Sequence, residues 1–378
     1  MKTNLTELKL FAKNLIGWRT NRKIVVISVD DYGNIRLAST QAREVLEKSG
    51  LKAKVNFDVF DALEDSTDLE QLYDTLTSVR DSNGNHAVFT PFTVPANIDF
   101  DKVIENGYDQ YYFELLPVTF NKLNGYENTL NLWKEGIRSG IMIPQYHGRE
   151  HVNLKIFNEK LARRDQDLII NLKNKSYARI INPGYKTISV TGAYMFWDFN
   201  ENTELQNIIT DGLDCFEKVF GYKAAHFNAP GGREHPVLHP ALFRKGIIYL
   251  DTERLQKVHQ GFGKHRYTIN YTGMKNVNKQ IYMVKNCVFE PTEHRGFDWV
   301  SYTLKQVDYA FRLGKPANIS SHRVNYAGHI DPENRKVGLG ALRRLLKEIV
   351  KKWPQVEFMS SIALMDLINS SSATIKSR

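Results

Sequence analysis

The sequence predicts an α/β protein that forms one domain, built from parallel strands as a barrel or an open sheet. Two observations predict this fold class. Short apolar stretches typical of strands alternate along the chain with amphipathic stretches that have the period of helices. No repeat or low-complexity linker divides the 378 residues, and an apolar content of 42% is sufficient for a large core.

The first apolar stretch, residues 24–29, is the strongest strand signal in the chain. Five of its six residues are β-branched and apolar, which is typical of a buried central strand. It ends in two adjacent carboxylates, Asp30 and Asp31, and Gly33 allows a turn after them. Buried acids need compensation, so a metal site is expected here, and a simple Asx turn is the alternative. Neighbouring strand residues point to opposite faces, so we expect a turn to bring both acids inward.

The remaining elements follow in order of the chain. The predicted strands are 51–57, 87–91, 141–146, 224–229, 246–251, 281–289, 316–321 and 356–360. The predicted helices are 38–48, 69–79, 126–138, 203–220, 300–313, 339–353 and 362–368. We expect a helical extension over residues 1–23, a single barrel-like domain over 24–370 and a frayed tail over 371–378. The aromatic-rich segment 99–125 is interpreted as an insertion that lines a sugar-binding groove, forms a lid or belongs to the core.

Composition limits the partners and the location of the protein. A net charge of +9 favours anionic partners such as acidic glycans or a membrane surface, and no nucleic-acid-binding motif is present. Cys215 and Cys287 are far apart, which predicts buried free thiols in a reducing compartment. No stretch has the length of a signal peptide core or a membrane span, so we expect a cytoplasmic protein. The apolar stripe of the N-terminal helix is expected to pack on the domain, with peripheral membrane contact as the alternative.

Two pairs of histidines have a spacing of four residues. His147 and His151 directly follow a predicted strand, and this spacing places both rings on one face of a helical turn. His235 and His239 share the spacing, but Pro236 predicts a helix start that leaves His235 outside the first turn. We therefore favour the first pair as metal ligands and expect no site at the second.

Asp31, His147 and His151 together make a ligand set of one carboxylate and two imidazoles. Such a set suits Zn²⁺ or a similar divalent ion and leaves a position for water. Asp30 is next to the proposed ligand and would accept a proton from that water. His322 follows the predicted strand 316–321, where an imidazole is suited to act as a general acid.

The order of these motifs resembles the polysaccharide deacetylases, the NodB-homology enzymes of carbohydrate esterase family 4. Residues 29–33 (Val-Asp-Asp-Tyr-Gly) resemble the family's Thr-Phe-Asp-Asp-Gly motif, and residues 147–151 match its His-Ser/Thr-x-x-His spacing. Weaker similarities connect other family segments to residues 51–57, 134–140, 319–322 and 356–360. The resemblance extends in islands from residue 24 to about residue 368.

This resemblance implies a distorted (β/α)7-type barrel with inserted loops. It implies Asp30 as the catalytic base, His322 as the acid, and Asp31, His147 and His151 as ligands of a divalent metal. Zn²⁺ is the first expectation, with Co²⁺, Ni²⁺ or Mn²⁺ as alternatives. The implied substrate is an acetylated carbohydrate.

One family motif is altered in this chain. Asn228-Ala229-Pro230-Gly231 stands where the family has Arg-x-Pro-Tyr, whose arginine steadies the catalytic aspartate. Asn228 has no charge to offer, so Arg149 or Arg233 is a candidate substitute. The Gly231 N–H remains available for an oxyanion. Asp251 stands where the family has the aspartate that orients the arginine.

The favoured function is a metal-dependent deacetylase that hydrolyses N- or O-acetyl groups of a sugar or polysaccharide precursor. One alternative is a barrel that binds carbohydrate without turnover, which the missing arginine favours. Another is a metalloprotease, because His147-x-x-Glu150-His151 has the spacing of inverted zincins. The sequence leaves open the sugar, the type of acetyl linkage and the oligomeric state.

Overall fold

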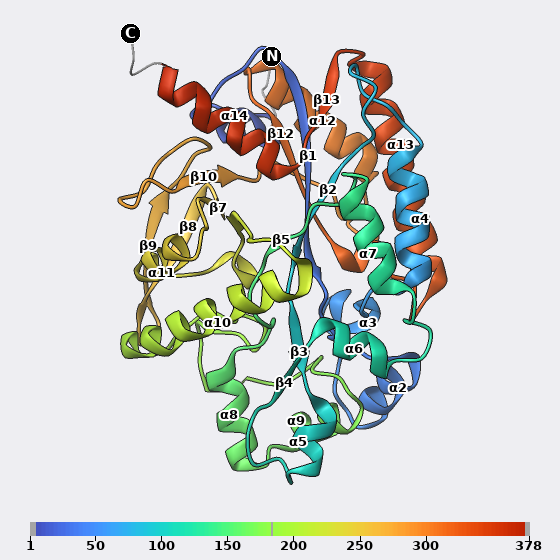
Figure 1. Ribbon diagram of the computed structural model, residues 1–378, viewed down its shortest axis with the longest axis vertical. Coiled ribbons are helices and arrows are strands. Elements are labelled where there is room, and N and C mark those ends of the chain that lie inside the picture. The colour runs from blue at the N-terminus through green and yellow to red at the C-terminus, as the bar shows by residue number, and fades with distance from the viewer. Residues whose placement is uncertain (1–4, 183, 375–378) are drawn as a thin grey trace.

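A curled sheet of parallel strands forms the centre of the protein (Figure 1). The computed structural model describes residues 5–182 and 184–374, and within this part the sheet has nine strands. Eight follow one another in the order β10-β7-β6-β5-β2-β1-β12-β11, and β13 pairs with the beginning of β1. Their bounds are β1 Lys23–Tyr32, β2 Phe89–Thr93, β5 Gln145–Tyr146, β6 His226–Phe227, β7 Tyr249–Thr252, β10 Ile281–Val284, β11 Cys287–Val288, β12 Ala317–His322 and β13 Val356–Phe358.

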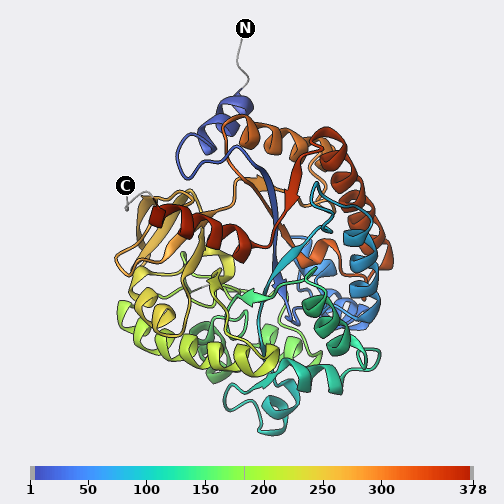
Figure 2. The same cartoon turned by 45° about the horizontal axis from the view of Figure 1, so that its top comes forward.

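The sheet curls into a distorted barrel because its two edge strands are close in the chain. β10 ends at Val284 and β11 begins at Cys287, so only two residues connect the two edges. Helices surround the strands on the outside (Figure 2). The predicted fold class is confirmed. The predicted strand 281–289 is divided at Lys285 and Asn286, which is one reason why the sheet has more strands than a seven-unit barrel.

Several helices that cover the barrel pack side by side around its wall. α12 contacts α13, α13 contacts α4, and α4 contacts α7. The longer helices are α2 Thr40–Lys48, α4 Ser66–Thr77, α7 Thr129–Arg138, α8 Leu154–Arg163, α9 Gln166–Lys173, α10 Asn202–Phe220, α12 Trp299–Arg312, α13 Pro332–Lys352 and α14 Ser361–Thr374. The short ones are α3 Phe57–Phe60, α5 Phe100–Glu105, α6 Leu116–Lys122, α11 His239–Arg244, η1 Phe199–Glu201, η2 Pro230–Gly232, η3 Pro236–Leu238 and η4 Arg323–Asn325.

β1 is buried along nearly its whole length, as its β-branched sequence predicts. Every residue from Ile24 to Tyr32 is buried. β1 pairs in parallel with β12 along most of its length, with β2 near its carboxyl end and with β13 near its start. All three pairings direct the carboxyl ends of neighbouring strands to the same end of the barrel, where Asp30 and Asp31 lie.

Several features of the structure differ from the sequence predictions. Residues 51–56 form no strand, because Lys52, Lys54 and Val55 face solvent and only Leu51 is buried. A hairpin of β8 (Leu255–Gly261) and β9 (Lys264–Ile269) was not predicted, since charged residues interrupt the apolar pattern of both strands. The last helix continues to Thr374, so the predicted tail is helical as far as that residue, and residues 375–378 lie outside the described part.

The aromatic segment 99–125 folds as α5, β4 (Phe113–Leu115) and α6. β4 pairs with β3 (Ala96–Ile98) in a separate antiparallel ribbon. Phe100 and Phe120 are buried in the main core. These aromatic side chains therefore contribute to packing, as the core interpretation predicted.

The N-terminal segment lies beside the open edge of the sheet. α1 (Leu5–Lys13) contacts α12, and Asn286 in the β10–β11 connection donates a hydrogen bond of 2.8 Å to Asn14. Leu10 and Asn14 are buried, whereas Leu8, Phe11 and Leu15 are exposed. These three residues of the apolar stripe that was expected to pack on the domain therefore face solvent, whereas Trp18 of the same stripe packs against a buried apolar cluster, as expected.

Two further expectations concern thiols and membrane spans. Cys215 and Cys287 are both buried and unbonded. Among the helices of the described residues, none combines the length and the apolar character that a membrane crossing requires.

A buried arginine next to the end of β12 offers a test of the fold. Arg323 is 1% exposed and pairs with Asp61 at 2.6 Å and Glu64 at 3.0 Å. Arg323→Met leaves two buried carboxylates without a cation, so we expect a loss of about 3–5 kcal/mol in the free energy of unfolding. Urea denaturation measures this change. Arg312→Met, which breaks the exposed pair with Asp308, should cost no more than about 0.5 kcal/mol; equal losses would contradict the assignment.

Candidate metal centre and active site

A β-bulge at the end of β1 brings two adjacent carboxylates to the same cavity. The register between β1 and β2 shifts between Val29 and Tyr32, and Asp31 has a φ of 76°. A left-handed residue in a strand interrupts the alternation of side chains, so both Asp30 and Asp31 line the cavity. The sequence predicted a turn after the strand, whereas the structure has a bulge within it. Aspartate tolerates this backbone conformation better than most residues.

Asp31, His147 and His151 converge as the sequence predicted. One ligand atom from each lies within 4.8 Å of the other two, and all three side chains are buried. Asp31 Oδ1 is 3.2 Å from His147 Nε2 and 2.9 Å from His151 Nε2. Burial alone would raise the pKa of Asp31, but the charge of His151 and hydrogen bonds from both imidazoles lower it well below its ordinary value. The carboxylate is therefore ionised and suited to a cation.

The two imidazoles come from a loop, not from the helical turn that their spacing suggested. β5 ends at Tyr146, and residues 147–153 are irregular, with Gly148 at a φ of 138°. His147 Nδ1 is 2.7 Å from the carbonyl oxygen of Asn228. A carbonyl only accepts, so Nδ1 carries a proton and Nε2 is the nitrogen that faces Asp31; Nε2 donates to Asp31 here and would offer its lone pair to a cation once it loses that proton. This arrangement and the ligand set fit a divalent cation, and Zn²⁺ is the metal that two imidazoles and one carboxylate suit well.

Asp30 is held by a lysine that the sequence motifs did not reveal. Lys285 Nζ lies 2.9 Å from Asp30 Oδ1 and 2.7 Å from Oδ2, and Asn228 donates to Oδ1 at 2.8 Å. Burial alone would raise the pKa of Asp30, but the charge of Lys285 and those of neighbouring imidazoles lower it. Lys285 belongs to the two-residue connection between β10 and β11, so the segment that joins the two edge strands of the sheet carries this ammonium group.

The two arginines considered as substitutes have other positions. Arg149 pairs with Glu150 at 2.6 Å and with Asp211 at 2.7 Å. Arg233 acts electrostatically on Glu253. Lys285 therefore provides the positive charge next to Asp30 that neither arginine provides.

His322 lies at the other side of Asp30 and has an acidic partner of its own. Its Nδ1 is 2.7 Å from Glu290 Oε1, and its Nε2 is 3.9 Å from Asp30 Oδ2. Burial alone would lower the pKa of His322, but the charge and hydrogen bond of Glu290 raise it to about 10. Glu290, which Asn325 also holds at 2.6 Å, is a second residue that no motif indicated. His322 is protonated at neutral pH and able to donate a proton.

All eight sequence-predicted site residues line one cavity of about 510 Å³. Gly231 has a φ of 69° and Asn228 holds Asp30, so residues 228–231 form one wall. Asp251 lies on the neighbouring strand β7, beside these residues, and burial raises its pKa to about 7 despite the charge of Lys285. The remaining lining residues are Lys13, Arg36, Phe57, Gly232, Thr252, Glu253, Arg254, Lys285 and Ser320.

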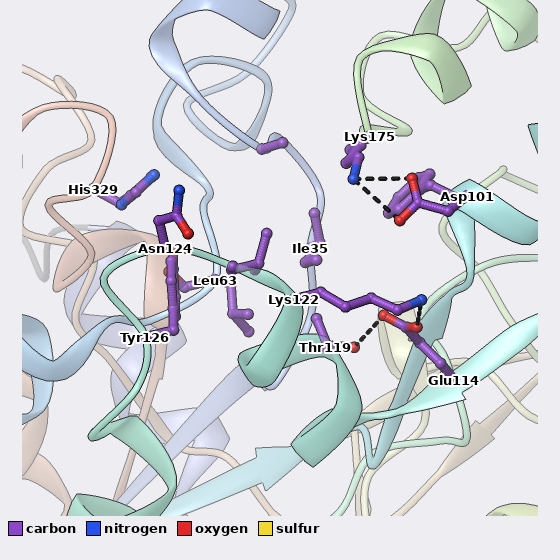
Figure 3. A pocket seen from close by; sticks show the side chains of 13 residues that line it. Ile35, Leu63, Asp101, Glu114, Thr119, Lys122, Asn124, Tyr126, Lys175 and His329 are labelled. Carbon is purple, nitrogen blue, oxygen red and sulfur yellow. Dashed lines mark hydrogen bonds and ion pairs between the residues drawn. The ribbon is translucent and has the colours of Figure 1, made fainter.

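Two other features are separate from this cavity. His235 accepts a hydrogen bond from the Val237 N–H, and His239 lies 3.5 Å from Glu234, so this second pair of histidines forms no shared ligand set in the described residues. The insertion lines a different pocket with an apolar floor that includes Ile35 and Leu63, where Lys122 pairs with Glu114 (Figure 3). Within the described chain, no residue of 99–125 lines the cavity that holds the triad.

Comparisons with known proteins return similar folds. No protein-family model matches the sequence, and no curated protein does. A protein named as a polysaccharide deacetylase from Mycobacterium smegmatis has 11% identity over 94% of both chains, with a TM-score of 0.46. Another from Pseudomonas aeruginosa PAO1 has 10% identity over 92% of this chain and 91% of that chain, with a TM-score of 0.46.

A family 4 carbohydrate esterase from Streptomyces lividans, solved in complex with acetate, is a further similar structure. It has 10% identity over 90% of this chain and 92% of that chain, with a TM-score of 0.35. The function proposed below is argued from the side chains of this chain.

Metal binding by the triad is directly measurable. We expect the protein to bind one divalent cation, and Asp31→Asn or His147→Ala to weaken binding at least about 100-fold, because each removes a ligand from a three-ligand site. Calorimetric titration with Zn²⁺ measures the affinity. His235→Ala is the matched control, since it removes an imidazole of the same spacing elsewhere. Unchanged affinity in both triad variants would show that the cation binds at another place.

Proposed function

We propose that the protein is a metal-dependent hydrolase that removes acetyl groups from a carbohydrate. The observation that carries this proposal is the arrangement of a base and an acid, 3.9 Å apart, beside a cation-binding triad in one cavity. Asp30 and His322 line the same cavity as Asp31, His147 and His151. A base, an acid and a cation site are the three parts that hydrolysis of an amide or ester by water requires.

Each residue then has one task in the reaction. Asp31, His147 and His151 would hold a divalent cation, which would supply the Lewis acidity that activates water and polarises a carbonyl oxygen. Asp30, kept ionised by Lys285, takes the proton of the attacking water. The Gly231 N–H donates to the oxyanion. His322, protonated beside Glu290, gives a proton to the leaving nitrogen or oxygen, and acetate and the free amine or alcohol leave.

The geometry disfavours the metalloprotease alternative. Inverted zincins carry both histidines and the catalytic glutamate on one helix, whereas residues 147–153 here form a loop. Glu150 is buried and paired with Arg149 at 2.6 Å, which removes it from the role of a general base.

The non-catalytic alternative loses its main support. It depended on the missing arginine beside the catalytic aspartate, and Lys285 lies 2.7 Å from Asp30 in its place. The proposal also includes a single domain over residues 24–370, Zn²⁺ as the native metal and a cytoplasmic location.

Acetate release from acetylated sugars tests the proposed function. We expect the metal-loaded protein to release acetate, and Asp30→Asn to lower kcat at least about 100-fold, because general-base catalysis contributes that much. An enzyme-coupled acetate assay on N- and O-acetylated sugars measures this. Glu150→Gln should keep most of the activity, whereas it would abolish a protease. Full activity in Asp30→Asn would refute the proposed role of this residue.

The pH dependence tests the acid. His322 acts in its protonated form, so activity falls as the pH rises through the pKa of His322, which Glu290 raises to about 10. Glu290→Gln removes the charge that raises this pKa, so we expect the alkaline limb of kcat to move to lower pH. A bound cation lowers the pKa of His322 in both proteins and leaves the direction of the difference unchanged. Superimposable profiles of kcat against pH would contradict the role of Glu290.

A further inference from the structure

Three cations beside the active-site cavity have no acidic partner among the described residues. The other cations close to the reactive groups are paired, Lys285 with Asp30 and Arg36 with Asp58. Lys13 and Arg254 line the cavity of the triad, and both also line a small neighbouring cavity together with Lys315. No aspartate or glutamate lines that second cavity in the described part of the chain.

Arg254 donates hydrogen bonds to backbone carbonyls through one nitrogen, and its other two nitrogens have no acceptor in the described structure. One of its terminal nitrogens donates to the carbonyl oxygens of Lys13 and Ile16. Its Nε and its other terminal nitrogen are buried and have no acceptor among the described protein atoms. Burial without a carboxylate partner lowers the pKa of Arg254, which indicates an uncompensated cation.

Lys315 and Asn318, on the wall of the small cavity, are also buried polar groups that lack a carboxylate partner or an acceptor within the described residues. Lys315 is 5% exposed and donates to the carbonyl oxygens of Gly17 and Trp18. Burial and the charges of Arg19 and Arg254 lower the pKa of Lys315 to about 8. Asn318 is 3% exposed, and its Nδ2 has no acceptor among the described atoms. Unpaired buried donors and cations are costly unless a ligand satisfies them, and every free polar group here suits an anion.

We propose that the junction of the two cavities binds a phosphate group of the substrate, with Lys13 and Arg254 as its direct ligands. This inference rests on the proposed function and narrows its substrate to an acetylated sugar that carries a phosphate. The sugar lies over the triad, and the phosphate lies at the side of the cavity that the N-terminal segment forms. Phosphate suits this place because its several oxygens accept from both an ammonium and a guanidinium group.

The surface next to this junction is apolar, as a site that takes a phosphate linked to a lipid would require. Leu15, Ile16 and Leu255 are exposed neighbours of Lys13 and Arg254 along the chain, and Leu255 pairs with the exposed Ile269 across the β8–β9 hairpin. A sugar phosphate in solution and a sugar linked through phosphate to a lipid share the chemistry that the two cations recognise.

Binding of N-acetylglucosamine 1-phosphate, compared with N-acetylglucosamine, tests the inference by calorimetry. We expect the full chain to bind the phosphorylated sugar at least about tenfold more tightly, and Arg254→Gln and Lys13→Gln each to remove most of that preference. Arg266→Gln is the matched control, because Arg266 is an exposed arginine of the hairpin that directly follows Arg254 and it lines neither cavity. A purely structural Arg254 would change stability and leave the ratio of the two affinities unaltered.

The same titration on Asp31→Asn separates this inference from the proposed function. We expect this variant, which lacks the metal site, to keep the preference for the phosphorylated sugar, even if neither protein releases acetate. No preference in the full chain, or an equal preference in Arg254→Gln and Lys13→Gln, would overturn the inference. Sedimentation with phosphatidylcholine vesicles, with and without phosphatidic acid, identifies the source of the phosphate. Vesicle binding that needs both phosphatidic acid and Arg254 indicates a lipid phosphate. No vesicle binding, together with tight binding of the sugar phosphate, indicates a soluble sugar phosphate.

Discussion

The bulge at the end of β1 is the constraint on which the rest of the site depends. A regular strand would direct Asp30 and Asp31 to opposite faces, and only one of them would reach the cavity. The register shift before Tyr32 and the left-handed backbone of Asp31 bring both inward. Two buried carboxylates side by side repel each other, so the barrel has to supply positive charge from several directions. The imidazoles of His147 and His151 face Asp31, and Lys285 faces Asp30.

Each reactive side chain is held by a partner from a neighbouring strand end. Asn228, after β6, fixes the tautomer of His147 through its carbonyl oxygen and holds Asp30 through its side-chain amide. Glu290, after β11, keeps His322 protonated. Because parallel strands bring their carboxyl ends together, residues distant in sequence gather in one cavity without long loops. The roles of the two carboxylates differ because their partners differ: Lys285 keeps Asp30 ionised as a base, and the Nε2 atoms of His147 and His151, which face Asp31, complete a cation site.

Much of this arrangement was predictable from the sequence, and the failures have physical reasons. The barrel and the triad were predicted because β1 is continuously apolar and the ligands follow strand ends. Lys285 and Glu290 were missed because their partners lie more than 30 residues away in sequence and no local spacing marks them. The helical turn expected at residues 147–151 is a loop, because Gly148 has a backbone conformation that ends regular structure, yet the rings still converge with centroids 5.2 Å apart. The predicted strand 51–57 failed because residues 52–55 are all exposed, so neither face of such a strand is buried.

The central claim is that Asp31, His147 and His151 hold one catalytic cation beside Asp30 and His322. Anomalous diffraction at the zinc edge, measured on crystals grown with Zn²⁺, tests it most directly. The account predicts one strong peak bonded to Asp31 and to both Nε2 atoms at about 2.0–2.2 Å. A zinc peak elsewhere, with these three side chains unbound at the same Zn²⁺ concentration, would contradict it.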